Sequence, residues 1–177
     1  GFQDADYPDT RIRFILDEAL GEESYKTTAS TRGNGLNVKI AGGDSDGLLY
    51  GAMNLLEQLR STGSISDTKE SPRFPFRAIK FNLPWIPYRD GAALRLHDET
   101  CRDLAFWESF MDMMVENRLN TLTLWSLHPF HLMVRNTKYP EACDLSEQEL
   151  SEWQKFWHAL FSMAKERGID TFIVNWN

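Results

Sequence analysis

The 177-residue sequence has few cysteines for a metal site and few basic residues for nucleic-acid binding. Its two cysteines, Cys101 and Cys143, do not have the spacing of a metal-binding motif, so unpaired thiols are expected, with a disulfide as the alternative. Lys and Arg number 19 against 26 Asp and Glu, a formal net charge of −7. A nucleic-acid backbone requires a surplus of Lys and Arg, so this balance argues against a nucleic-acid partner but not against a neutral partner such as a sugar.

Long apolar runs and glycine-rich phosphate loops are missing as well. No run is long or apolar enough to cross a membrane, so no membrane partner is expected. No G-x-G-x-x-G follows a strand-like run, which weakens the prediction of a Rossmann-type sheet. The sequence starts at Gly1 without a basic-then-apolar leader, and the residues alone leave the compartment open.

The composition is that of a globular protein with many aromatic residues. Hydrophobic residues make up 42%, charged residues 25% and aromatic residues 12%, with six tryptophans. The length suits one domain, or one small domain with part of a larger one. A bulky core or stacking surfaces would account for the tryptophans.

The first part of the sequence predicts a small α+β domain, residues 1–70. Arg11–Leu16 has a strand pattern, and Asn34-Gly35 between two further strand-like runs is a strong hairpin signal. Asp46–Arg60 has the apolar spacing of a helix, which Ser45 or Asp46 can cap. Gly51 in that helix suggests a close approach to the sheet. Ser61–Pro75 is rich in Ser, Thr, Gly and Pro and is predicted to be a linker.

From Phe76 onward, predicted strands and helices alternate. The expected elements are strands 77–82, 121–125 and 171–176, with helices 102–118 and 146–168, the second opened by the capping box Ser146-x-x-Glu149 and ended by Gly168. Long loops follow the strands and short turns precede them, as in an α/β barrel. Residues 71–177 are therefore predicted to be the first three β/α units of a TIM-type (β/α)8 barrel. Three strands do not close a barrel and leave a bare edge, so we expect the N-terminal part of a longer enzyme.

Aromatic and amide side chains gather at the predicted strand ends, where such barrels bind ligands. Tryptophan faces suit the C–H faces of sugar rings, amides pair with hydroxyl groups, and a histidine shortly after the second strand can donate or accept a hydrogen bond. The predicted substrate-binding residues are Asn82, Trp85, Trp125, His128, Asn175 and Trp176. For each residue singly, the alternative is core or loop packing.

The catalytic residues are not assignable from the sequence. Glycoside hydrolysis needs two carboxylates across the scissile bond, or one carboxylate with a substrate-derived nucleophile. No Asp or Glu falls at a predicted strand end, and Asp90, Asp98, Glu99 and Glu141 lie in loops. His128-x-x-His131 has no third ligand at a sensible spacing, so no metal is expected. Nothing implies a cofactor.

Three stretches together resemble a known layout. Gly42–Leu59, GGDSDGLLYGAMNLLEQL, resembles the end of the α+β domain that precedes the barrel in β-hexosaminidases and α-glucuronidases. Ser71–Asn82, SPRFPFRAIKFN, resembles the entry to their catalytic barrel, and Met113–Trp125, MMVENRLNTLTLW, resembles its first helix and second strand. β-Hexosaminidases carry a sugar-binding Arg shortly after the first barrel strand. The corresponding FNLPWIPY has none, which places this sequence nearer the α-glucuronidases.

The resemblance implies a glycosidase that acts on a poly- or oligosaccharide in a secreted or periplasmic setting. It also implies that the catalytic carboxylates come from the fourth and later barrel strands, which lie outside this sequence. We therefore expect the 177 residues to be inactive alone, with the rest of the barrel missing. The alternative is a non-catalytic carbohydrate-binding or scaffold module, and another barrel enzyme such as a lyase or isomerase also fits, because fold does not fix function.

Overall fold

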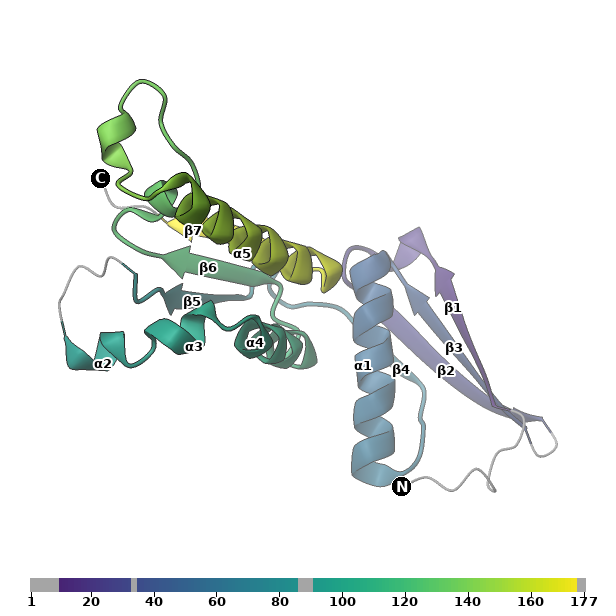
Figure 1. Cartoon of the computed structure of the whole chain (residues 1–177). Coiled ribbons are helices and arrows are strands. Elements are labelled where there is room, and N and C mark those ends of the chain that lie inside the picture. The colour runs from purple at the N-terminus through teal and green to yellow at the C-terminus, as the bar shows by residue number, and fades with distance from the viewer. Residues whose placement is uncertain (1–9, 33–34, 86–90, 175–177) are drawn as a thin grey trace. The chain divides into compact units, whose positions relative to one another are not determined.

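The computed structural model describes residues 10–32, 35–85 and 91–174, and the chain divides into two compact units. The units are Gly1–Pro75 and Phe76–Asn177, and each has a sheet of its own (Figure 1). The division falls close to the predicted boundary at residue 70. The roles assigned to the two domains stay predictions.

The first unit is a four-stranded mixed sheet with one long helix. The strand order is β1-β3-β2-β4, with β1 parallel to β3 and the other pairs antiparallel. The elements are β1 (Arg11–Leu16), the 3-10 helix η1 (Glu18–Leu20), β2 (Tyr25–Arg32), β3 (Gly35–Gly42), α1 (Ser45–Thr62) and β4 (Thr68–Glu70). The β2–β3 pairing confirms the predicted hairpin.

The predicted linker 61–75 is wrong in part, because β4 lies inside it. Thr68 pairs with Thr27 and Glu70 with Tyr25, at the edge of the sheet. The three residues of β4, TKE, are polar and lack an apolar strand pattern. Backbone pairing to an existing strand creates this element, so the composition of the segment alone could not reveal it.

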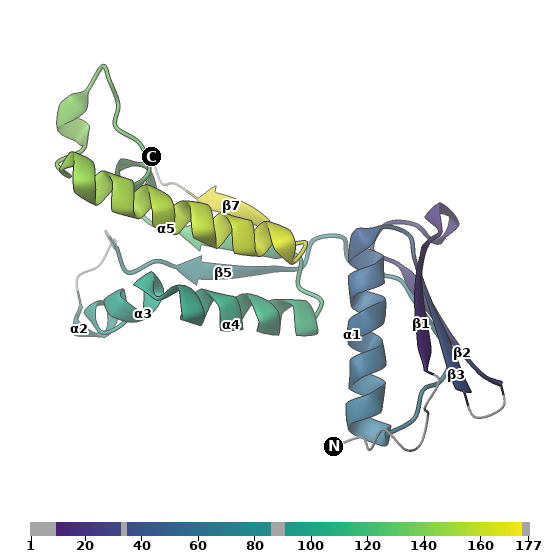
Figure 2. The same ribbon diagram turned by 45° about the vertical axis from the view of Figure 1, so that its right-hand side comes forward.

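Helix α1 lies along one face of the first sheet (Figure 2). Its N-cap is Asp44, whose carboxylate accepts a hydrogen bond from the Gly47 N–H at 2.7 Å, so the predicted caps at Ser45 and Asp46 are wrong by one or two residues. A Cβ at Gly51 would lie 2.5 Å from Cγ2 of Ile40. The glycine therefore permits the close approach of helix and sheet that the sequence suggested.

The second unit is a parallel sheet of order β5-β6-β7 with helices between its strands. Its elements are β5 (Ala78–Asn82), α2 (Ala92–Arg95), α3 (Asp98–Arg102), α4 (Leu104–Glu116), β6 (Thr121–Trp125), the 3-10 helices η2 (Pro129–Leu132) and η3 (Pro140–Ala142), α5 (Glu147–Glu166) and β7 (Asp170–Val174). The predicted helix 102–118 is instead interrupted at Asp103. The Asp103 carboxylate accepts a hydrogen bond from the Ala105 N–H at 2.9 Å and so starts α4 as a new helix.

Asn120 joins the three strands at their N-terminal edge. Its side-chain oxygen accepts a hydrogen bond from the Arg77 N–H at 2.9 Å, and its own N–H donates to the Arg77 carbonyl at 3.0 Å. Its carbonyl accepts a hydrogen bond from the Asp170 N–H at 2.9 Å. One asparagine thereby links the starts of all three strands through hydrogen bonds.

Helices cover one face of this sheet. Phe81 of β5 packs against the rings of Trp107 and Phe110 in α4, with centroid distances of 4.8 and 5.4 Å. Helix α5 joins α4 through Arg167, whose Nε lies 2.6 Å from Asp112. On the two outer strands the side chains that alternate with this buried set are exposed, including Lys80 and Asn82 of β5 and Phe172 of β7, which is 52% exposed; on the central strand Trp125 of the same face is buried. The opposite face is therefore open in the described part of the chain.

Candidate functional site

Polar and aromatic side chains come together at the C-terminal ends of β5 and β6. Asn82 is the register partner of Trp125, and Trp125 is that of Val174. Register partners in a sheet project from the same face. Lys80, two residues before Asn82, shares this face, and its Nζ lies 5.0 Å from the Trp125 ring centroid. A cation, an amide and an indole are thus gathered at one edge of the sheet.

This group combines hydrogen-bonding side chains with an aromatic ring. The amide of Asn82 offers both donors and acceptors, and the Lys80 ammonium is a donor with a full charge. The indole of Trp125 is only 7% exposed and the Lys80 ammonium lies over its ring, so it offers little open surface for stacking. Lys80 was not among the residues predicted from the sequence. The signal was available, because the alternation of β5 places residues 80 and 82 on the same face.

Trp85 lies on the helix-covered side. Its indole is 7% exposed and makes edge-to-face contacts with Trp153, Phe156 and Trp157, at centroid distances of 4.7, 5.5 and 5.8 Å. Its carbonyl accepts a 2.8 Å hydrogen bond from the Ser126 hydroxyl. Trp85 therefore joins the end of β5 to the end of β6, and the structure does not bring its ring to the Lys80–Trp125 pair. That Trp85 contacts a ligand stays a prediction.

His128 is exposed and lies three residues beyond the end of β6. Its carbonyl accepts a hydrogen bond from Nδ1 of His131, within the start of the long β6–α5 loop. Both histidines line a partly open hollow of about 810 Å³ in this loop. Asn175 and Trp176, predicted for the same site, lie outside the described residues, so their placement stays a prediction.

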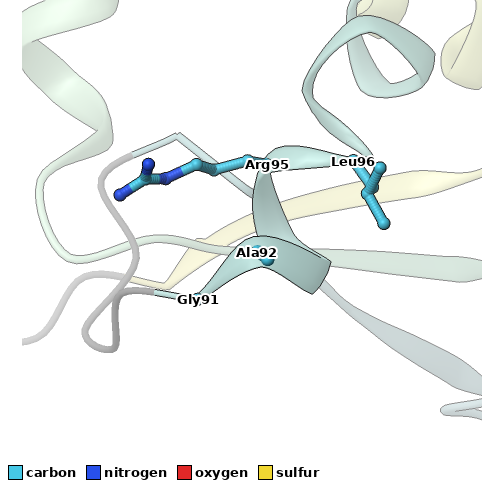
Figure 3. Close-up of a pocket in the computed structure, with 4 residues that line it drawn as sticks. All are labelled: Gly91, Ala92, Arg95 and Leu96. Atoms are coloured by element: carbon cyan, nitrogen blue, oxygen red, sulfur yellow. The ribbon is translucent and has the colours of Figure 1, made fainter.

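A second hollow, of about 510 Å³, lies at α2 (Figure 3). It is lined by Gly91, Ala92, Arg95 and Leu96, and the side chains of Arg95 and Leu96 point in different directions. Leu96 is 76% exposed. The described lining residues provide one charged group and few polar contacts, so they alone do not supply the hydrogen-bonding groups of a specific small-molecule site.

Cysteine and metal chemistry find no support in residues 10–32, 35–85 and 91–174. Both cysteines are free thiols and are buried. Burial, with a smaller effect from the Asp98 carboxylate, raises the pKa of Cys101 to about 11, which is opposite to what a nucleophilic thiolate requires. No three His, Cys, Asp or Glu side chains in these ranges group closely enough to hold a metal ion. No helix in them has the length and apolar character needed to span a membrane.

The sequence matches no protein-family model and no curated protein. Solved structures of glycoside hydrolases are nevertheless similar to it in fold. A GH138 enzyme targeting pectin rhamnogalacturonan II matches 96% of this chain, with a TM-score of 0.76 and 22% identity. The β-N-acetylhexosaminidase from Bacteroides fragilis NCTC 9343 matches 93% with a TM-score of 0.57 and 15% identity, and CpGH84B matches 86% with a TM-score of 0.52 and 18% identity.

These matches take up 25%, 32% and 23% of the three solved chains, respectively. At these levels of identity the likeness establishes the fold alone. The chain thus has a mixed α/β fold that corresponds to about a quarter to a third of several larger glycosidase structures, in line with the family resemblance seen in the sequence.

Proposed function

We propose that this chain is the N-terminal part of a glycoside hydrolase that acts on a poly- or oligosaccharide. In this proposal, residues 1–70 form the accessory α+β domain and residues 71–177 form the first three β/α units of the catalytic barrel. The observation that carries the proposal is the match to the GH138 enzyme over 96% of the chain, which takes in both units. The neighbours' hydrolase activity is the property we extend to this chain.

The open face of the second sheet supports the barrel assignment. In a (β/α)8 barrel the helices surround the strands, and the inward side chains fill the interior in layers. Lys80, Asn82 and Phe172 project from the face that no described helix covers. The remaining strands of a barrel would cover this face and pair with the outer edges of β5 and β7.

The site residues that we propose for sugar binding are Asn82, Trp125 and His128, with Lys80 added from the structure. Asn175 and Trp176 remain proposed from their sequence positions. Lys80 favours an acidic sugar, because its ammonium beside Asn82 can pair with a uronate carboxylate. This agrees with an α-glucuronidase-like substrate more than with a hexosamine, and with the pectic target named for the GH138 enzyme.

The chain alone should be inactive. At the C-terminal strand ends the described residues are an amide, an indole and an aliphatic side chain, at Asn82, Trp125 and Val174. None of these can act as the acid or the base that glycoside hydrolysis requires. We propose that the catalytic carboxylates come from later strands of the full-length enzyme, in a secreted or periplasmic setting.

The deciding experiment compares the 177-residue chain with the full-length protein on uronic-acid and hexosamine oligosaccharides. Product formation is followed by chromatography of released sugars. We expect turnover of a uronic-acid substrate by the full-length protein only. Turnover by the 177 residues alone would refute the proposed division of the site, and no turnover of any saccharide by the full-length protein favours the non-catalytic carbohydrate-binding module.

A further inference from the structure

The β6–α5 loop, residues 126–146, is held in place at several points. The indole Nε1 of Trp157 donates to the Leu132 carbonyl at 3.1 Å, and the Gln154 side chain donates to the Met133 carbonyl at 3.0 Å. Both donors belong to α5. The first half of the loop is thus fastened to a helix that is part of the packed unit (Figure 1).

Arg135 holds the second half of the loop. Its guanidinium donates to the carbonyls of Cys143, at 3.0 Å, and Leu145, and its Nε lies 3.0 Å from a Glu147 carboxylate oxygen. The Cys143 thiol in turn donates to the His131 carbonyl at 3.3 Å. These contacts close the loop around a hollow, so its walls are formed before any ligand arrives, which lowers the entropic cost of binding.

The volume of this hollow, about 810 Å³, is within the range of small-molecule sites. Its lining combines an aromatic ring with several hydrogen-bonding groups. The polar and aromatic residues among those that line it are His128, Phe130, His131, Asn136, Glu141 and Asp144.

The lining has the groups that a sugar ring requires. Phe130 is 47% exposed and offers an accessible aromatic face for C–H groups. His131 Nδ1 faces the His128 carbonyl and must donate to it, which leaves Nε2 as the acceptor of the neutral ring. Glu141 and Asp144 add carboxylate oxygens that can accept hydrogen bonds from hydroxyl groups. The Asn136 oxygen already accepts from the N–H groups of Lys138 and Tyr139, so its amide NH2 is the group left to donate to a ligand.

The charge of the lining selects the class of sugar. It includes two carboxylates, from Glu141 and Asp144, and neither lysine nor arginine lines the described walls. The nearby Arg135 is committed to the loop carbonyls and Glu147. Two carboxylates repel a uronate and accept hydrogen bonds from a neutral sugar's hydroxyl groups.

We propose that the β6–α5 hollow is a subsite for a neutral sugar unit of the oligosaccharide, next to the Lys80–Asn82–Trp125 site. This inference rests on the proposed glycosidase function. The chain leads directly from one place to the other, because His128 lines the hollow and lies three residues after Trp125, the last residue of β6. The protein would then recognise a mixed chain, with an acidic unit at the strand ends and a neutral unit at the loop.

The test measures binding to the full-length protein by titration calorimetry, with xylotetraose, galactotetraose and tetragalacturonic acid as probes. Phe130→Ala should weaken binding of a neutral probe by about 3- to 10-fold, since aromatic contacts of this kind contribute modest energies. Phe130→Trp should restore it. Tyr139→Ala is the matched control, because Tyr139 is 51% exposed in the same loop but does not line the hollow.

A double variant, Glu141→Gln with Asp144→Asn, tests the charge. We expect it to strengthen binding of tetragalacturonic acid. Its affinity for the neutral probes should match that of the Tyr139→Ala control. Unchanged binding of tetragalacturonic acid by the double variant would overturn the charge assignment, and equal binding of the neutral probes by the Phe130→Ala and parent proteins would overturn the subsite.

Turnover is measured in parallel, so that the two proposals fail separately. Hydrolysis that is indifferent to Phe130→Ala, for a tetrasaccharide and for a 4-nitrophenyl glycoside alike, overturns the subsite and leaves the glycosidase standing. A rise in KM for the tetrasaccharide but not for the 4-nitrophenyl glycoside supports the subsite. Binding that depends on Phe130 without any turnover keeps the subsite and refutes the hydrolase.

Discussion

Single side chains in this protein take their roles from the face of the strand on which they lie. Lys80 and Phe81 are neighbours in β5, but Phe81 packs on α4 while Lys80 lies over Trp125 on the open face. The tryptophans differ in the same way. Trp85 and Trp125 are equally buried, yet Trp85 contacts α5 and Trp125 contacts Lys80.

Replacement of Lys80 by methionine in the full-length protein should selectively weaken binding of acidic oligosaccharides. Loss of a charge-assisted hydrogen bond corresponds to about 10- to 100-fold in affinity. Tetragalacturonic acid and galactotetraose are compared by calorimetry. Lys69→Met, an exposed lysine of β4, serves as the control. Equal weakening for both probes would argue against a role in reading charge.

Cys101 should resist thiol reagents in the folded protein. Its pKa of about 11, against an ordinary 9.0, leaves roughly a hundredfold less thiolate at pH 8, and only 2% of the residue is exposed. Because the folded-state pKa is raised, the associated stability is present below pH 9 and is lost as the pH rises toward 11. Colour development with Ellman's reagent, with and without denaturant, checks this, and rapid labelling of native Cys101 would contradict it.

Local hydrogen bonds set the ends of the helices in the second unit, and the sequence predicts some of these ends but not others. The Ser146–Glu149 capping box and the positive φ of Gly168 were both predicted, because cap residues have strong and local preferences. The break at Asp103 was not predicted, because an aspartate among helix-forming residues is compatible with a surface position inside one longer helix.

Removal of the cap should destabilise α5. Ser146→Ala loses the hydroxyl that accepts from the Glu149 N–H at 3.2 Å, and N-cap losses cost about 1 kcal/mol. Ser151→Ala, inside the same helix, is the control and should be neutral. Chemical denaturation measures the free energy of unfolding. If Ser151→Ala lowered the free energy of unfolding as much as Ser146→Ala does, the loss could not be assigned to the cap.

The same box makes stability depend on acid pH. Hydrogen bonds from the Ser146 hydroxyl and backbone N–H lower the pKa of Glu149 from its ordinary 4.5. A lowered folded-state pKa stabilises the fold above pH 4.5, and this contribution is lost as the pH falls through the lower value. Glu149→Gln should flatten that part of the stability curve, measured by thermal unfolding between pH 2 and 6.

The β6–α5 loop shows where sequence reasoning stops for the site. The sequence singles out His128 because it follows a predicted strand, whereas Phe130 and Asp144 carry no signal and Glu141 has only its position in a loop. These residues meet because Arg135 closes the loop through backbone carbonyls, which no residue pattern encodes. The strand ends, by contrast, follow from the two-residue period of the side chains.

For the molecule as a whole, the open sheet face distinguishes two hypotheses. In one, the second unit is part of a catalytic barrel; in the other, it belongs to a non-catalytic carbohydrate-binding or scaffold module. If the second unit is part of a barrel, Phe172 is buried in the full-length protein. Phe172→Ala should then cost about 3–5 kcal/mol in unfolding free energy there. Leu96→Ala, at a side chain that is 76% exposed, is the control.

The comparison is made by denaturant unfolding of the full-length protein. Within the 177 residues Phe172 is 52% exposed, so the same substitution there should cost much less. A cost in the full-length protein no larger than that of Leu96→Ala would show that this face stays in contact with water, which is incompatible with a barrel interior.

Edge strand β4 also has a consequence for how the protein is synthesised. Its pairing with β2 completes the last ladder of the first sheet at Glu70, before Phe76 begins the second unit. Every contact that the first sheet needs is therefore available on the nascent chain before any strand of the second unit has been translated. Domains of multidomain proteins generally fold as units during synthesis, with the N-terminal one first. The first unit can thus complete its folding before β5, β6 and β7 have all been translated and can pair.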